Sequence, residues 1–171
     1  MTAQIQSEHF TMALFSILDE TFDNVHGYFL DQGTALFETL ALISAEEASI
    51  PIGNQCATLA AQVKHLTFYL DVLERYARTS QKEEVDWDEI WRTVKEVTPS
   101  EWESLKTELR HTYNRIRLLI YDTPVWPSEH EIGGAIAMIA HTAYHLGEIR
   151  QALCTLKPLT RRDYDQQNLQ L

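Results

Sequence analysis

Apolar residues recur at intervals of three and four along four long stretches of the chain, the spacing of amphipathic α-helices. The first stretch begins after a candidate cap at Ser7 and is expected to end near Gly27. The others cover about 55–78, 99–121 and 129–156. No stretch shows the sustained alternation of a β-strand. The pattern therefore predicts an all-α protein.

Helix start signals support these boundaries. A Ser or Thr followed three residues later by Glu forms a capping box, in which each side chain satisfies a backbone N–H at the helix start. The sequence contains Ser44 with Glu47, Thr98 with Glu101, and Ser128 with Glu131. Shorter amphipathic segments, within 34–43 and around Trp87 and Trp91, predict extra helices in the connections.

Four long amphipathic helices are most simply packed as a four-helix bundle in one domain covering residues 1–171. The connection between the second and third helices spans about 20 residues, 79–99, enough to cross the length of the bundle. Those two helices could therefore run parallel, although the length alone does not decide the topology. Residues 158–171 follow the last helix, contain little apolar content and are expected to be a frayed tail.

Charge and composition exclude several classes of partner. The 25 acidic and 14 basic residues give a net charge of −11, with no cluster of Lys or Arg, so neither nucleic acid nor an anionic membrane is an expected partner. No apolar run reaches the roughly 18 residues of a membrane span, and the N-terminus does not resemble a signal peptide. We therefore expect a cytoplasmic protein whose two cysteines, Cys56 and Cys154, remain thiols.

His141 and His145 are the most informative residues of the fourth helix. They lie one turn apart on the same face, where two imidazoles can share one metal ion. Their surroundings are small or apolar, so we expect the helix to be buried nearly all round. Burying polar groups costs free energy unless they find partners, and a divalent cation satisfies two neutral imidazoles together.

A third histidine, His65, occupies an apolar position on the second helix. The ordinary alternative is a hydrogen-bonded core residue, and two histidines one turn apart also occur by chance. The same spacing is found in zincin proteases, but their motif requires Glu directly after the first histidine, where this chain has Thr142. A zincin protease is therefore excluded.

Two segments carry a resemblance to a known family. The sequence from His141 to Ala152, HTAYHLGEIRQA, is similar to the C-terminal signature of the DinB/YfiT-like superfamily, and TLAAQVKH, ending at His65, resembles its second-helix motif. The resemblance extends over about residues 7–157. It implies an up-down-down-up four-helix bundle, often homodimeric, with a divalent metal ion held by three histidines, here His65, His141 and His145.

Three nitrogen ligands leave coordination positions open for water or substrate, which favours a metal-dependent hydrolase acting on an unknown small molecule. Zinc or nickel suits imidazole best, while iron, cobalt or manganese also fits. Glu148 could be a general base, an outer partner of His145 or a fourth ligand, and Gln62 could orient His65; simple packing is the alternative for both.

Two other functions fit the same ligands. The superfamily that the chain resembles includes metal-dependent transferases that use a low-molecular-weight thiol. Arg75 and Arg150 are candidate cationic contacts for such a thiol, although each could instead form a salt bridge. The third hypothesis is a metal-binding or dimerising protein without catalysis, in which the ion joins the second and fourth helices.

Other conspicuous residues have ordinary interpretations. Trp87, Trp91 and Trp102 are expected to pack the long connection against the bundle, with a lid over the site as the alternative. Four further histidines have no partner at ligand spacing and are expected at the surface or in turns: His9, His26, His111 and His130.

Overall fold

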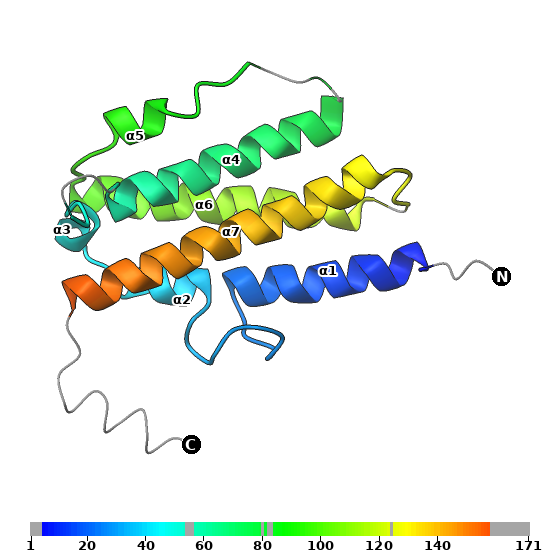
Figure 1. Ribbon diagram of the computed structural model, residues 1–171, viewed down its shortest axis with the longest axis horizontal. Coiled ribbons are helices and arrows are strands. Elements are labelled where there is room, and N and C mark those ends of the chain that lie inside the picture. The colour runs from blue at the N-terminus through cyan, green and yellow to red at the C-terminus, as the bar shows by residue number, and fades with distance from the viewer. Residues whose placement is uncertain (1–4, 54–56, 80, 82–83, 124, 158–171) are drawn as a thin grey trace.

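The computed structural model describes residues 5–53, 57–79, 81, 84–123 and 125–157, and over these residues the chain is helical, with seven α-helices and no strand. The prediction of an all-α protein is confirmed. Four helices are long and lie side by side (Figure 1). They are α1 (Ser7–Phe22), α4 (Leu59–Thr79), α6 (Pro99–Tyr121) and α7 (Glu129–Leu156); the short ones are α2 (Leu36–Ala41), α3 (Ala45–Ala48) and α5 (Glu89–Thr93).

Ion pairs define how α4 lies against α6. Lys64 Nζ contacts Glu108 Oε2 at 2.8 Å, and farther along both helices Arg115 Nε contacts Glu74 Oε2 at 2.9 Å. Because residue numbers rise together from the first pair to the second, α4 and α6 run in the same direction. The long connection that contains α5 makes this arrangement feasible.

The opposite register joins α1 to α6. The hydroxyl of Tyr113 donates to Asp19 Oδ1 at 3.2 Å, while Phe15, earlier in α1, faces the ring of Tyr121, later in α6. These two helices are therefore antiparallel.

Between the long helices lies a continuous core of fully buried aliphatic and aromatic side chains. The largest are Trp102, Tyr113, Phe22, Leu18, Leu36, Leu40, Leu59, Leu66, Leu70, Leu109, Ile116 and Leu146.

Two of the three predicted capping boxes are present. Ser44 Oγ accepts from the Glu47 N–H at 3.2 Å, and Thr98 Oγ1 accepts from the Glu101 N–H at 3.3 Å, with both glutamates returning the bond. At the start of α7, however, Ser128 Oγ accepts from the N–H of residue 130 and donates to a carboxylate oxygen of residue 131. That helix still begins and ends where predicted.

The predicted bounds of the first two helices are wrong. Helix α1 begins at Ser7, with Gln6 as its N-cap, and it ends at Phe22 instead of continuing towards Gly27. The cause lies at Glu20, which is fully buried and accepts hydrogen bonds from the backbone N–H groups of residues 26, 28, 29 and 30. These bonds fold the chain back over the end of α1. Helix α4 begins at Leu59, later than the predicted residue 55.

The expectation that the last helix is buried nearly all round is also wrong. One stripe of α7 faces solvent, and it includes Ile136 at 50% exposure and Tyr144 at 61%. Gly133, Ala140 and Gly147 lie on the same stripe and are exposed. Apolar residues occur on the solvent side as well as the core side of this helix, so composition alone could not identify its exposed face.

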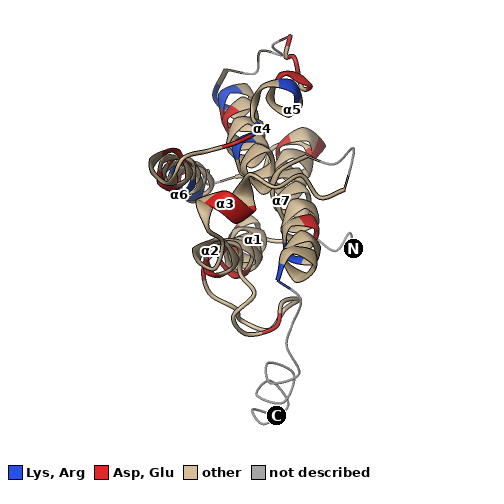
Figure 2. Ribbon diagram, turned by 90° about the vertical axis from the view of Figure 1, so that its left-hand side faces the viewer, with Lys and Arg blue, Asp and Glu red and all other residues tan. Residues whose placement is uncertain are grey.

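Charged residues are distributed over several helices. Figure 2 shows acidic residues on α3 and along the connection to α5, with basic residues interspersed on α4, α5 and α6. Among the described residues, no helix combines the length and apolar content that crossing a bilayer requires.

Candidate metal centre

The structure brings together the three histidines that the sequence singled out. His65 lies on α4, and His141 and His145 lie one turn apart on α7. One ligand nitrogen from each ring lies within 4.8 Å of those from the other two, and His65 and His145 are buried. This is the one group of metal-ligating side chains found within the described part of the chain.

His65 and His141 face each other through their Nε2 atoms, which are 3.0 Å apart. Two imidazole nitrogens at this distance either share one proton in a hydrogen bond or ligate one ion. Nitrogens that bind the same zinc ion at about 2.1 Å lie roughly 3.0–3.4 Å apart, so the spacing fits a shared ion with little movement.

The carboxylate of Glu148 contacts one ring nitrogen of His145. Its Oε2 lies 2.8 Å from His145 Nδ1, which directs the Nδ1 proton to the carboxylate and leaves Nε2 with its lone pair facing the other rings. A carboxylate that accepts from a ligating imidazole fixes the tautomer and raises its basicity. Glu148 also accepts a hydrogen bond from the hydroxyl of Tyr144, which raises the pKa of that phenol.

Electrostatics keep the three imidazoles neutral. Burial, together with the neighbouring histidines, lowers the pKa of His65 to about 4, and the same causes lower the pKa of His141 to about 4. Burial also lowers the pKa of His145, although Glu148 opposes the shift. The neutral imidazole is the form that binds a metal ion. The site is therefore in its ligating form at neutral pH.

Aromatic rings surround the histidines. Tyr69 stacks on His141 with ring centroids 3.7 Å apart, and Trp91 of α5 lies over His65 at 4.4 Å. Trp87, before α5, meets the His65 ring at 6.5 Å and is 40% exposed. The connection that contains α5 thus covers the histidine cluster. Apolar surroundings of this kind restrict water and strengthen electrostatic interactions at the site.

Trp102 has a different place from the other two tryptophans. The sequence grouped all three with the long connection, but Trp102 belongs to α6, where it is 2% exposed and donates from Nε1 to the carbonyl oxygen of Ile43 at 2.8 Å. It therefore anchors the segment between α2 and α3. The contribution of Tyr69 was missed; its position one turn after His65 was the available signal.

Of the two interpretations of Gln62, the structure favours simple packing over orientation of His65. Gln62 Oε1 and His65 Nδ1 are both buried, and neither has a hydrogen-bond partner among the described residues.

The four remaining histidines are exposed, as predicted: His9, His26, His111 and His130. Cys154 is an exposed thiol, and Cys56 lies outside the described residues.

The donor set fits a divalent ion, because three neutral imidazole nitrogens converge and one of the three rings is oriented by a carboxylate. Compared with protein-family models, curated proteins and solved structures, the chain has no significant match. The DinB-like resemblance of the two histidine segments therefore stays a prediction.

Proposed function

We propose that His65, His141 and His145 hold one divalent metal ion. The observation that carries this proposal is the convergence of three neutral ring nitrogens within 4.8 Å on two helices. If His141 and His145 lay one turn apart only by chance, no third neutral imidazole from another helix would be expected to face them. Zinc or nickel is the ion best suited to imidazole ligands, and iron, cobalt and manganese fit the same donors.

We further propose that the chain is a DinB-like protein with the up-down-down-up bundle of that superfamily. Three features support this topology: the parallel register of α4 and α6, the antiparallel register of α1 and α6, and the meeting of His65 with His141 and His145 across α4 and α7. The motif residues then lie on the helices where the resemblance expects them.

The function that this centre supports best is metal-dependent hydrolysis of a small molecule. When bound, the ion would supply Lewis acidity and lower the pKa of a water molecule at an open coordination position. The protein's own contributions are local. Glu148 holds the Nδ1 proton of His145 so that Nε2 stays a ligand, and Tyr69 and Trp91 fix the His141 and His65 rings and exclude bulk water.

A thiol-dependent transferase would need a cationic contact for its cofactor. Arg150, one candidate, is partly buried and donates to Thr39 Oγ1 of α2 at 3.2 Å, so it is engaged within the fold. We therefore keep hydrolysis as the first proposal and thiol transfer as the second. A non-catalytic role for the ion is the remaining alternative.

Activity assays with metal-free and metal-reconstituted protein test this proposal. Carboxylic ester, amide and phosphoester substrates would be offered with and without glutathione, using wild type, His145→Ala and the surface control His111→Ala. We expect thiol-independent hydrolysis that requires metal and is lost only in His145→Ala. Turnover that requires the thiol would establish the transferase instead, and binding of metal without turnover of any substrate would establish the non-catalytic role.

We also propose that the protein forms a homodimer through the exposed stripe of α7. An apolar side chain at Ile136 and the large ring of Tyr144, beside small residues that permit close approach, are typical of a helix face that packs against a partner. Analytical ultracentrifugation should find a dimer that Ile136→Glu dissociates. Leu118→Glu, at a residue 60% exposed on α6, should leave it intact. A wild-type monomer would refute the proposal.

A further inference from the structure

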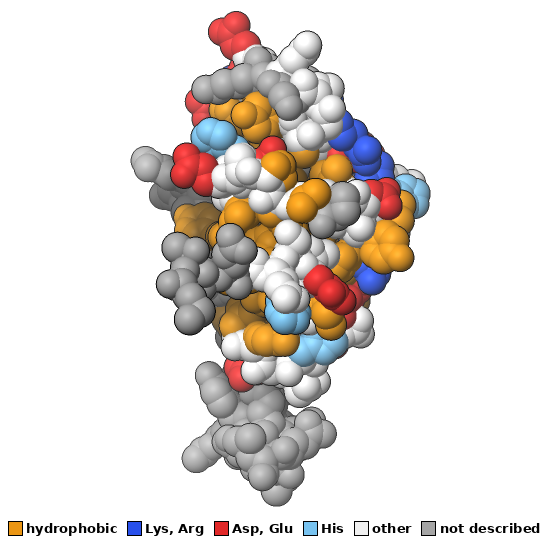
Figure 3. Space-filling model, turned by 90° about the vertical axis from the view of Figure 1, so that its right-hand side faces the viewer, with side chains coloured by type: hydrophobic (Ala, Val, Ile, Leu, Met, Phe, Trp, Pro, Cys, Tyr) orange, Lys and Arg blue, Asp and Glu red, His pale blue; other side chains and the backbone are white. Residues whose placement is uncertain are grey.

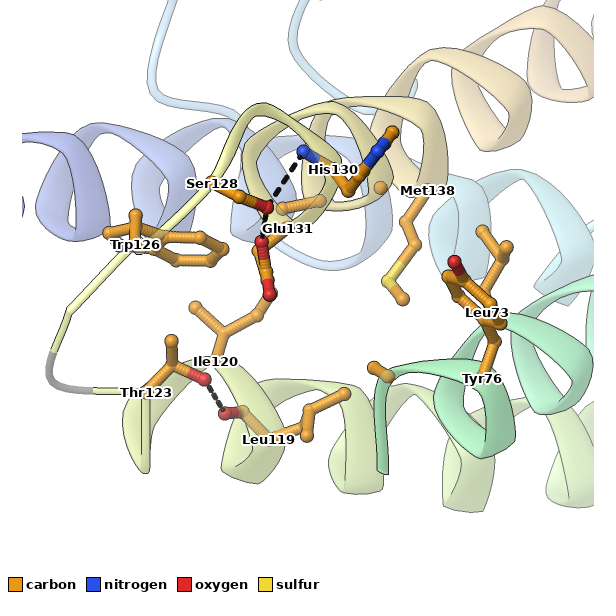
Figure 4. A pocket seen from close by; sticks show the side chains of 13 residues that line it. Leu73, Tyr76, Leu119, Ile120, Thr123, Trp126, Ser128, His130, Glu131 and Met138 are labelled. Carbon is orange, nitrogen blue, oxygen red and sulfur yellow. Dashed lines mark hydrogen bonds between the residues drawn. The ribbon is translucent and has the colours of Figure 1, made fainter. Parts of the chain in front are cut away.

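A second feature with binding potential lies apart from the histidines. A cavity of about 350 Å³ opens between α4, α6 and the first turns of α7, walled by Leu73, Ile120 and Met138 (Figure 4). Ligand pockets span roughly 300–1,000 Å³, so this one is large enough for a small organic molecule. Figure 3 views the molecule from this end and shows exposed hydrophobic side chains with acidic groups close to several of them.

The charge of the cavity comes from Glu131. Among the described residues that line it, Glu131 is the only acidic one and none is Lys or Arg. The Ser128 hydroxyl donates to one carboxylate oxygen and lowers the pKa of Glu131, so the group is ionised at neutral pH. In Figure 4 the other oxygen points into the space between Ile120 and Met138. A negative charge thus faces an otherwise largely apolar chamber.

Two aromatic side chains add to the preference for positive charge. Trp126 lies on the same side of the cavity as Glu131, and Tyr76 lies across from it (Figure 4). The indole of Trp126 is held in place: Nε1 donates to Thr11 Oγ1 at 2.9 Å, and Phe10 packs against the ring at 4.9 Å. The Trp126 ring lines the cavity, and an indole π system can attract a cation.

We propose that this cavity binds a small amine or quaternary ammonium compound with an apolar body. The cationic head lies between Glu131 and Trp126, and the apolar body packs against Leu73, Ile120 and Met138. A carboxylate or phosphate ligand would be repelled by Glu131. A neutral apolar ligand would cover the carboxylate without compensating its charge, which is unfavourable.

Calorimetric titration of the full chain with three ligands of similar length tests the charge preference. The ligands are octyltrimethylammonium, octanoate and octan-1-ol, each kept below the concentration at which it aggregates. The cation should bind at least about tenfold more tightly than either of the others. No binding of the cation, or equal binding of octanol or octanoate, would overturn the proposal.

Paired variants test the location. Glu131 is exposed, so Glu131→Gln, whose amide oxygen can still accept from Ser128, should weaken binding of the cation about three- to fivefold. Glu129→Gln removes the same charge from an exposed neighbour that does not line the cavity, and should change binding less than about twofold. Equal effects of the two variants would show that only net charge matters and would refute a site at Glu131.

A filling variant gives an independent check of the same site. Gly134 lines the cavity, and a Cβ at this position meets no atom within 4 Å. Leucine also favours the helix over glycine, so Gly134→Leu should fold. It should abolish binding of octyltrimethylammonium, whereas Asn114→Leu, at an exposed position of α6 outside the cavity, should preserve it. Undiminished binding by Gly134→Leu would place the ligand elsewhere and overturn the proposal.

Discussion

Replacing Glu20 with Gln tests how the fold holds the segment after α1. The carboxylate of Glu20 is fully buried and accepts four backbone N–H groups, at 2.6–3.0 Å. Burial alone would raise the pKa of this carboxyl, but the four donors outweigh it and lower the pKa from 4.5 to about 2. A difference of this size between folded and unfolded states corresponds to about 3 kcal/mol of stability at pH 7.

The sign of the pH dependence follows from the lowered pKa. A carboxyl whose pKa is depressed by folding stabilises the protein above the unfolded pKa of 4.5, and this contribution is lost as the pH falls towards 2. In the Glu20→Gln variant the amide keeps one acceptor but turns an NH₂ group towards N–H donors. The variant should therefore be less stable than wild type by about 3 kcal/mol at pH 7 and by about 2 kcal/mol at pH 3.5.

Urea denaturation followed by circular dichroism at pH 7, 4.5 and 3.5 measures this difference. Glu8→Gln is the matched control, because Glu8 is an exposed residue of the same helix and its replacement changes the net charge equally. The control should differ from wild type by less than about 0.5 kcal/mol at pH 7. If Glu20→Gln matched that control, or if its deficit were constant from pH 7 to 3.5, the assignment of this stability to the buried carboxylate would be wrong.

Three further changes test the metal centre and the fold. Glu148→Gln, which removes the charge behind His145, should weaken zinc binding about 10- to 100-fold in competition with a chelating dye; unchanged affinity would exclude a supporting role. Trp91→Ala should expose His65 and accelerate its modification by diethylpyrocarbonate in the metal-free protein several-fold, measured by mass spectrometry; an unchanged rate would contradict the cover provided by α5. Thr98→Ala should lower the free energy of unfolding by about 1 kcal/mol in urea denaturation, through loss of the cap of α6; a change below about 0.3 kcal/mol would argue against that cap.

Local interactions were the most predictable part of this fold. Capping at Ser44 and Thr98 depends on residues three positions apart, so the sequence alone predicts it. The shared face of His141 and His145 follows likewise from helix geometry. By contrast, the early end of α1 depends on Glu20 meeting N–H groups that are brought together only when the following loop folds.

The rest of the site could not be predicted because it depends on which side chains meet across helices far apart in the sequence. His65 entered the predicted site because it occupies an apolar position on its helix, and the motif resemblance then supported it. Its spacing along α4 gives no sign of which α7 residues it faces. The contact of Trp91 with His65 depends on the path of a long connection, which periodicity does not specify. Gln62 shows the limit of local spacing. A position one turn before His65 permits a hydrogen bond between the two side chains but does not ensure one.

Elemental analysis of untagged protein tests the central claim, that three histidines hold one ion, most directly. Wild type, His141→Ala and His111→Ala would be purified in parallel, and metal-free samples would be reloaded with zinc, nickel or manganese before removal of unbound metal. We predict about one transition-metal ion per chain in wild type and in the exposed-histidine control, and loss of that ion in His141→Ala. If wild type neither retained metal nor took it up, or if His141→Ala bound as much as the control, the histidine cluster would be part of the core and the proposed hydrolase would have no metal centre.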